Sequence, residues 1–207
     1  MHIEKIELQN FRNYKNLELE FSKNVNLILG KNAQGKTNLL EAVYLTAIGR
    51  SFRTSKDLDL VKFNENNAIV KVWAEKELNS TTVEISIKRK GEKSSEKFIK
   101  KDRKNVTKTS QLLKNILIVI FSPEDLKIVK DEPEKRRKFI DRELSQISPK
   151  YYNSLSNYKK SLLQRNTYLK EDNLEPSIID LWDIQLSKYG AEVIFLRKEF
   201  IKKLSEY

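Results

Sequence analysis

Apolar and polar residues alternate along several short segments in the first half of the chain. Apolar side chains recur at every second position in 17–21, 69–74 and 82–87, and Ile3, Ile6 and Leu8 mark one more such segment. A period of two residues is typical of a β-strand with one buried face. We therefore expect antiparallel strands joined by hairpins, with a polar and aromatic turn at 10–14.

Two other segments are largely apolar, and this pattern predicts strands buried on both faces. They are Val25–Leu29 and Ile116–Phe121. Beyond Pro133 the spacing of apolar residues changes to three and four, which predicts helices. Pro149 and Pro176 open two further helical segments, and the last carries an apolar stripe from Ile179 to Leu204.

The segment between Val25–Leu29 and a helix predicted from Thr37 to near Gly49 matches G-x-x-x-x-G-K-[ST] at every position. It reads Gly30-Lys31-Asn32-Ala33-Gln34-Gly35-Lys36-Thr37. A strand, a glycine loop and a helix start place successive backbone N–H groups around an anion. Lys36 would reach the β- and γ-phosphates of a nucleotide, and the Thr37 hydroxyl would bind Mg²⁺. We therefore expect ATP and Mg²⁺ as cofactors.

The chain is strongly basic, with a net charge of +11. A charge of this size attracts polyanions such as DNA, although it also suits a soluble surface. The absence of cysteine excludes disulfides and thiolate zinc sites and fits the reducing cytoplasm, where we place the protein. The longest apolar run, Ile116–Phe121, falls far short of the roughly 20 residues that a membrane span needs, so no membrane partner is expected.

The positive charge is densest between Lys88 and Lys108, where ten basic and three acidic residues give a net charge of +7. Such a run either guards a sheet edge against aggregation or contacts phosphates. A second basic loop follows the first predicted helix. The candidate DNA contacts are Arg50, Arg53, Lys100, Lys101, Arg103 and Lys104, and a plain solvated loop stays an alternative for the two arginines.

The segment after the second apolar run permits two interpretations. Glu124 and Asp125 would be Mg²⁺-binding carboxylates if this run were the Walker B strand, but Ser122 and Pro123 intervene. The same four residues also form a good helix start, with a cap, a proline and two acids on the helix dipole.

Five blocks of the chain together resemble the RecF family of bacterial recombination-mediator ATPases, which are relatives of the SMC and ABC ATPase heads. The blocks are 8–14, the P-loop with Asn32-Ala33-Gln34, 121–126, Arg136-Arg137 with Phe139 and Asp141, and Tyr158 with Gln164-Arg165-Asn166. The resemblance implies an α/β fold: half of an ABC/SMC-head-like P-loop NTPase core with antiparallel β-hairpins, followed by a helical lobe. We expect the ATPase lobe at 1–125 and the helical lobe, truncated at its C-terminus, at 126–207.

The resemblance also implies a function and a nucleotide site. Arg12 and Asn13 match positions that line the nucleotide in SMC-like heads, and they add to the eight P-loop residues. The full-length family protein is a slow DNA-dependent ATPase that dimerises with ATP, binds single-stranded and gapped DNA, and helps RecO and RecR load RecA. It acts in the DNA damage (SOS) response, at single-strand gaps and stalled replication forks.

The family's signature motif and Walker B carboxylates belong to its C-terminal half. No catalytic residue is therefore expected within this chain, which should bind ATP without appreciable hydrolysis. Two alternatives stay open: the head of another SMC-type chromosome or repair ATPase, and a P-loop kinase acting on a metabolite.

Overall fold

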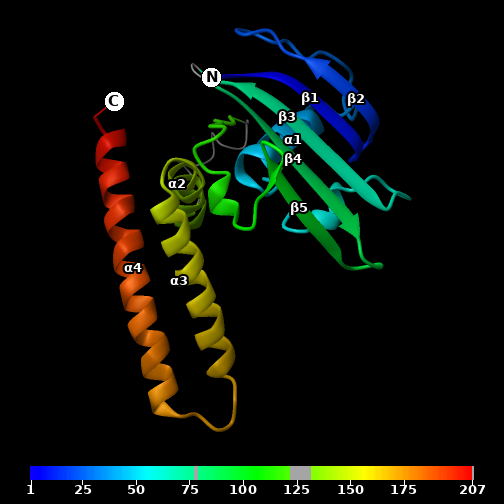
Figure 1. Ribbon diagram of the computed structural model, residues 1–207. Helices are drawn as coiled ribbons and strands as arrows, with labels where there is room; N and C mark the ends of the chain where they lie inside the picture. Colours follow the sequence, from blue (N-terminus) through cyan, green and yellow to red (C-terminus); the bar gives the residue numbers. More distant parts are fainter. Residues whose placement is uncertain (77–78, 122–131, 207) are drawn as a thin grey trace. The chain divides into compact units, whose positions relative to one another are not determined.

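The computed structural model describes residues 1–76, 79–121 and 132–206 (Figure 1). The chain divides into two compact units, Met1–Ile118 and Val119–Tyr207. The boundary expected at residue 125 lies outside the described residues. Among the helices of the described ranges, none has the length and apolar character that crossing a membrane requires.

The first unit contains a six-stranded antiparallel sheet with strand order β2-β1-β3-β4-β5-β6 (Figure 1). Its strands are β1 (His2–Phe11), β2 (Tyr14–Glu20), β3 (Asn67–Glu75), β4 (Ser80–Arg89), β5 (Ser95–Lys101) and β6 (Lys104–Asn105). The alternating segments thus form strands, and the prediction of antiparallel hairpins is confirmed. The basic stretch from Lys88 to Lys108 covers β5, β6 and the turns at the two ends of β5.

One face of this sheet packs against helix α1 (Lys36–Ile48), which contacts β1, β3 and β4. The buried face is formed by alternate apolar residues of the central strands: Ile6, Leu8, Val70, Val72, Ala74, Val83, Ile85 and Ile87. The helix ends where the sequence predicts, because Gly49 adopts a left-handed φ of 78° and donates its N–H to the Leu45 carbonyl.

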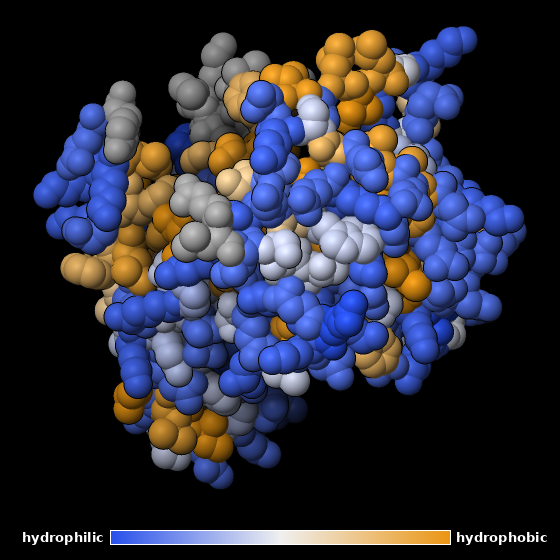
Figure 2. Space-filling model, turned by 45° about the horizontal axis from the view of Figure 1, so that its top comes forward, coloured by the Kyte–Doolittle hydropathy of each residue, from blue (hydrophilic) through white to orange (hydrophobic). Residues whose placement is uncertain are grey.

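The two segments predicted as doubly buried strands are not strands in the structure. Val25, Leu27 and Leu29 are 83%, 79% and 79% exposed, and Val119 and Phe121 are also exposed. A strand buried on both faces needs partner strands and packed layers, and no described strand pairs with either segment. Exposed apolar side chains interrupt a largely hydrophilic surface as separate patches in Figure 2.

The second unit is helical, as predicted, and consists of α2 (Pro133–Ile147), α3 (Pro149–Tyr168) and α4 (Pro176–Leu204). Each helix begins with a proline, whose fixed φ and missing N–H suit the first helical position. Helices α3 and α4 form a long hairpin (Figure 1). The small core of the unit contains Leu144 of α2, Tyr151 and Leu155 of α3, and Val193 of α4.

A polar cluster ties these three helices together. Arg197 on α4 donates from Nε and Nη2 to Asp141 Oδ1 on α2, at 3.0 and 2.7 Å. Its Nε also lies 2.9 Å from the hydroxyl of Tyr151 on α3, and this hydroxyl donates to Asp141. Burial, followed by the hydrogen bond to Asp141, raises the pKa of Tyr151 above its ordinary value.

Candidate nucleotide-binding site

The backbone of the glycine loop is shaped by two residues with left-handed φ values near its end. Ala33 has a φ of 65° and Gly35 a φ of 105°. A Cβ atom at position 35 would lie 2.8 Å from both side-chain heteroatoms of Asn13 and 2.9 Å from the Tyr14 hydroxyl. Glycine is therefore required here by its backbone conformation and by the close approach of the β1–β2 turn.

The start of α1 is suited to an anion. Gly35 is its N-cap, and the helix has neither a side-chain cap nor an acidic residue in its first turn. The first N–H groups of a helix lack intrahelical acceptors and lie at the positive end of its dipole. The ammonium of Lys36 lies over the loop, donating to the carbonyls of Gly30 at 2.5 Å and Lys31 at 2.8 Å. Donors and positive charge thus converge on one loop, as phosphate binding requires.

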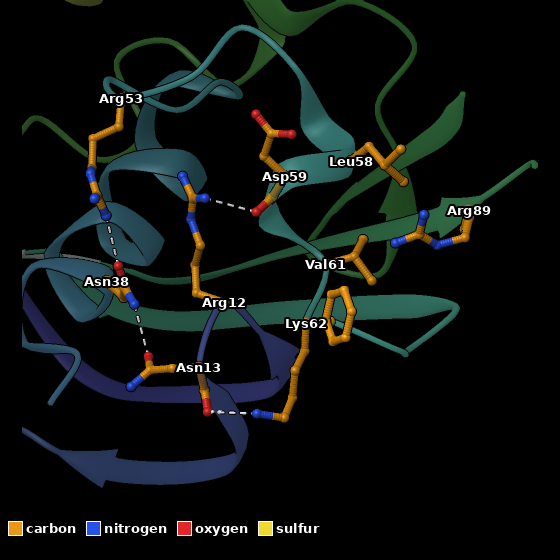
Figure 3. Close-up of a pocket in the computed structure, with 10 residues that line it drawn as sticks. Arg12, Asn13, Asn38, Arg53, Leu58, Asp59, Val61, Lys62 and Arg89 are labelled. Atoms are coloured by element: carbon orange, nitrogen blue, oxygen red, sulfur yellow. Dashed lines mark hydrogen bonds between the residues drawn. The ribbon is translucent and has the colours of Figure 1, made fainter. Parts of the chain in front are cut away.

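A chain of hydrogen bonds leads away from this loop. Asn13 Nδ2 donates to the backbone carbonyl of Gln34 at 3.2 Å, and Asn38 Nδ2 donates to Asn13 Oδ1 at 2.8 Å. Arg53 Nη1 then donates to Asn38 Oδ1 at 2.7 Å. Figure 3 shows the three side chains following one another along the pocket wall. The β1–β2 turn, α1 and the loop after α1 are therefore connected through side chains.

This chain of hydrogen bonds ends at the buried carboxylate of Glu41. Glu41 lies on α1 with no exposed side-chain surface, and Arg12 binds it through Nε at 2.9 Å and Nη2 at 2.7 Å. Ser51 donates to Glu41 at 2.5 Å, and Arg53 Nη1 lies 3.4 Å from it. Burial acts to raise the pKa of Glu41, but the hydrogen bonds from Arg12 and Ser51 and the charges of the two arginines lower it below its ordinary value.

These groups border an open pocket of about 780 Å³ (Figure 3). Four cationic side chains line it, together with Asn13, Asn38, Asp59 and apolar residues; the cations are Arg12, Arg53, Lys62 and Arg89. Lys62 donates to the Asn13 carbonyl at 2.9 Å, which holds the pocket wall against the β1–β2 turn. A concave surface with four cationic side chains next to the glycine loop suits an anionic ligand such as a nucleotide.

Comparison with known proteins places this geometry in a family. The family model described as an AAA domain matches residues 5–207. The chain belongs to the AAA domain family. It also matches the N-terminal portion of the DNA replication and repair protein RecF of Clostridium tetani, with 45% identity over 207 residues. This match covers 100% of the chain and 55% of the relative, so the chain spans about half the length of that relative.

Solved structures agree with this assignment. A structure of the recombination mediator protein RecF-ATP in the RecFOR pathway has a TM-score of 0.89 and 40% identity. The match covers 98% of this chain and 54% of that one. An SMC ATPase structure matches with a TM-score of 0.53 and 24% identity, over 69% of this chain and 99% of that chain. The fold is that of a P-loop ATPase of the RecF and SMC-head type, as expected.

The structure brings the ten residues predicted for the nucleotide together at one place. The P-loop residues form the loop and the start of α1, Asn13 contacts the loop directly, and Arg12 lines the adjoining pocket. Sequence reasoning missed Asn38, Glu41 and Ser51. Glu41 offered one signal, since it is a lone acid within the apolar run from Leu39 to Leu45.

The six residues predicted for DNA do not form one patch. Arg53 belongs to the pocket wall, and Lys100 on β5 pairs with Glu84 at 3.6 Å. Lys101 and Lys104 face each other across the β5–β6 turn, which also contains Arg103. Arg50 is exposed at the end of the α1 segment. The β5–β6 turn thus groups Lys101, Arg103 and Lys104, and Lys100 lines a pocket together with Arg103.

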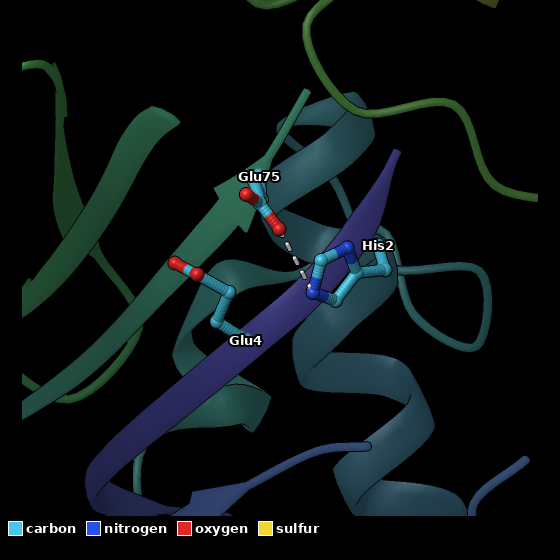
Figure 4. A group of neighbouring side chains, drawn as sticks. All are labelled: His2, Glu4 and Glu75. Atoms are coloured by element: carbon cyan, nitrogen blue, oxygen red, sulfur yellow. Dashed lines mark ion pairs between the residues drawn. The ribbon is translucent and has the colours of Figure 1, made fainter. Parts of the chain in front are cut away.

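Glu124 and Asp125, the Walker B candidates, lie outside the described residues, so this interpretation stays a prediction. At the start of β1, ligand atoms of His2, Glu4 and Glu75 lie within 4.8 Å of one another (Figure 4). Glu75 already contacts His2 at 3.3 Å and the ammonium of Lys23 at 3.6 Å. We interpret this group as a surface ion-pair cluster.

Proposed function

We propose that this chain is the ATP-binding portion of a RecF-type DNA replication and repair protein. The observation that carries the proposal is the uncapped start of α1, where the glycine loop and Lys36 converge next to a cationic pocket. The 45% identity to RecF and the similarity to RecF-ATP support it.

The residues present fit ATP and Mg²⁺. The loop from Gly30 to Gly35 and the first N–H groups of α1 would hold the phosphates, with Lys36 turning from the loop carbonyls to a phosphate oxygen. The hydroxyl of Thr37, exposed at the second position of α1, would bind Mg²⁺, which neutralises phosphate charge. The pocket lined by Arg12 and Asn13 would receive the rest of the nucleotide.

The wider activity is proposed for the whole protein. It includes ATP-dependent dimerisation, binding to single-stranded and gapped DNA, and joint action with RecO and RecR to load RecA. The name RecF and its place in the RecFOR pathway support these partners. We expect the 207-residue chain alone to bind ATP with negligible hydrolysis, because the resemblance to RecF places the Walker B carboxylates and the signature motif in the other half of the family protein.

The test is substitution of the loop lysine. Lys36→Ala removes a charged donor that makes no core contact, so ATP affinity should be lost while thermal melting stays unchanged. Lys93→Ala, on the exposed β4–β5 turn, is the matched control and should bind ATP like the wild type. ATP binding that survives Lys36→Ala would contradict the nucleotide assignment. Turnover on the order of 1–100 s⁻¹, as in kinases, would contradict the expected lack of hydrolysis.

A further inference from the structure

The buried carboxylate of Glu41 organises the loop that follows α1. Ser51 donates to Glu41 at 2.5 Å, and the same Ser51 oxygen accepts from the backbone N–H groups of Arg53 at 2.9 Å and Thr54 at 3.2 Å. The backbone of 51–54 is therefore folded around a hydroxyl that Glu41 holds in place. A fully buried charge is tolerated only with such partners, so this set of bonds is strongly specified.

The other side of Glu41 is connected to the phosphate-binding loop. The hydrogen-bond chain from the Gln34 carbonyl passes through Asn13 and Asn38 to Arg53, and Arg53 reaches Glu41. Because Gln34 lies within the loop that would surround the phosphates, a change in that loop acts on the first link of this chain. Arg53 is the shared member, since it bonds both to Asn38 and to Glu41.

We infer that Glu41 is a positioning residue that couples nucleotide binding at the glycine loop to the conformation of the 51–54 loop and its Arg53. The inference rests on the proposed function, because it requires a nucleotide at that loop. Glu41 touches no nucleotide itself; it fixes Arg12 on one side and Ser51 on the other, so that the arginines stand at the pocket wall. Loading of the loop is thereby transmitted to a segment about one helix length further along the chain.

Hydrogen exchange of backbone amides with and without MgATP tests the coupling. In the wild-type chain, MgATP should slow exchange at 31–37 and also at Arg53 and Thr54. Glu41→Gln keeps the size of the side chain but removes its charge, so protection at 31–37 should persist while protection at 53–54 is lost, with ATP affinity at least fivefold weaker. Glu7→Gln is the matched control and should behave like the wild type, because Glu7 is a half-buried glutamate on β1 that pairs with Lys5 at 2.9 Å and has no link to the glycine loop among the described contacts.

A second variant tests the coupling in case the Glu41→Gln protein does not fold. Asn38→Ala breaks the middle of the chain without leaving a buried charge, and it should also abolish the nucleotide-dependent protection at 53–54. A melting curve separates loss of coupling from loss of fold. Wild-type protection at 53–54 in a folded variant of either kind overturns the inference.

The wild-type result separates the inference from the proposed function. MgATP protection at 31–37 without any change at 53–54 overturns the coupling and leaves nucleotide binding standing. Failure of the wild-type chain to bind ATP overturns both.

Discussion

Glu41 in the first unit and Asp141 in the second are both carboxylates bound by an arginine through two nitrogen atoms. Arg12 uses Nε and Nη2 on Glu41, and Arg197 uses Nε and Nη2 on Asp141. Each carboxylate also has a hydroxyl partner, Ser51 for Glu41 and Tyr151 for Asp141. The local chemistry of the two clusters is therefore nearly the same.

The elements that supply the partners differ. Around Asp141 the arginine and the hydroxyl come from the long helices α3 and α4, so the cluster fastens regular elements to one another. Around Glu41 they come from the β1–β2 turn and the loop after α1, and the arginines line an open pocket. Loops rearrange at lower free-energy cost than packed helices. An ion pair between helices thus stabilises a fold, whereas one between loops can position groups for a ligand.

A large effect on stability is expected from the helical cluster. Asp141→Asn leaves Arg197 without its counter-charge, and their side chains are only 14% and 22% exposed. We expect a loss of about 2 to 4 kcal/mol in the free energy of unfolding, near the range for a broken buried pair. Urea unfolding measures it, with Asp172→Asn on the exposed α3–α4 loop as the control. ATP affinity should not change. If Asp141→Asn lowered ATP affinity together with the free energy of unfolding, the Asp141 cluster would not be purely structural.

The Glu41 cluster should show an effect of similar size that depends on pH. Glu41→Gln leaves Arg12 without its carboxylate, and the loss should be about 2 to 4 kcal/mol at neutral pH, because this carboxylate is also buried. Because the pKa of Glu41 is lowered in the folded chain, the unfolded chain takes up this proton more readily, and the contribution is lost as pH falls.

The difference in unfolding free energy between wild type and Glu41→Gln should therefore be fully present above pH 4.5, the ordinary glutamate value, and shrink below it. Unfolding curves at a series of pH values measure this, with Glu7→Gln as the reference. A difference that is constant down to acid pH would mean that the charge of Glu41 contributes nothing.

Tyr151→Phe separates the hydroxyl from the ion pair in the helical unit. It removes the hydrogen bonds to Asp141 and Arg197 while keeping the buried ring, so the loss should be about 1 to 2 kcal/mol. Tyr189→Phe is the control, because its ring keeps the contact with the Lys188 ammonium at 5.9 Å. A loss equal to that of Asp141→Asn would show that the tyrosine, rather than the charge pair, holds the three helices.

Local sequence patterns correctly predicted the elements whose structure depends mainly on neighbouring residues in the sequence. Alternation fixed which side chains of β3 and β4 face the core, and prolines marked the helix starts at 133, 149 and 176. The same reasoning was wrong for Val25–Leu29 and Ile116–Phe121. An apolar run records a tendency to be buried, but burial requires neighbouring strands, and no described strand pairs with these segments.

The candidate site also has one part that the sequence predicts and one part that it does not. The glycine loop is contiguous, and its spacing predicts its chemistry without reference to the rest of the fold. The Glu41 cluster joins positions 12, 41, 51 and 53, and no local pattern indicates that a turn and a loop meet on one helix. A lone acid in an apolar helical run was the only trace, and it predicts a buried charge without naming its partners.

The smallest effect on stability is expected where charged side chains are exposed. The partner proposed for these exposed charges is DNA. Lys101, Arg103 and Lys104 surround the β5–β6 turn. Reversing all three to Glu should change the free energy of unfolding by no more than about 0.5 kcal/mol for each residue, as for most surface substitutions. The same change should weaken DNA binding equally for all sequences, because phosphate contacts carry no sequence information.

The control reverses three charges at the opposite end of β5. Lys88, Lys90 and Lys93 lie at the β4–β5 end, one strand length or about 20 Å from the β5–β6 turn. Binding measured over a salt series should show a shallower slope for the β5–β6 variant, by about 0.9 for each lost duplex phosphate contact or 0.7 on single strands. Equal losses in both variants would mean that net charge, rather than this turn, attracts DNA. Unchanged binding of the β5–β6 variant at low salt would remove the turn from the DNA surface and leave Arg50 and Arg53 to be tested.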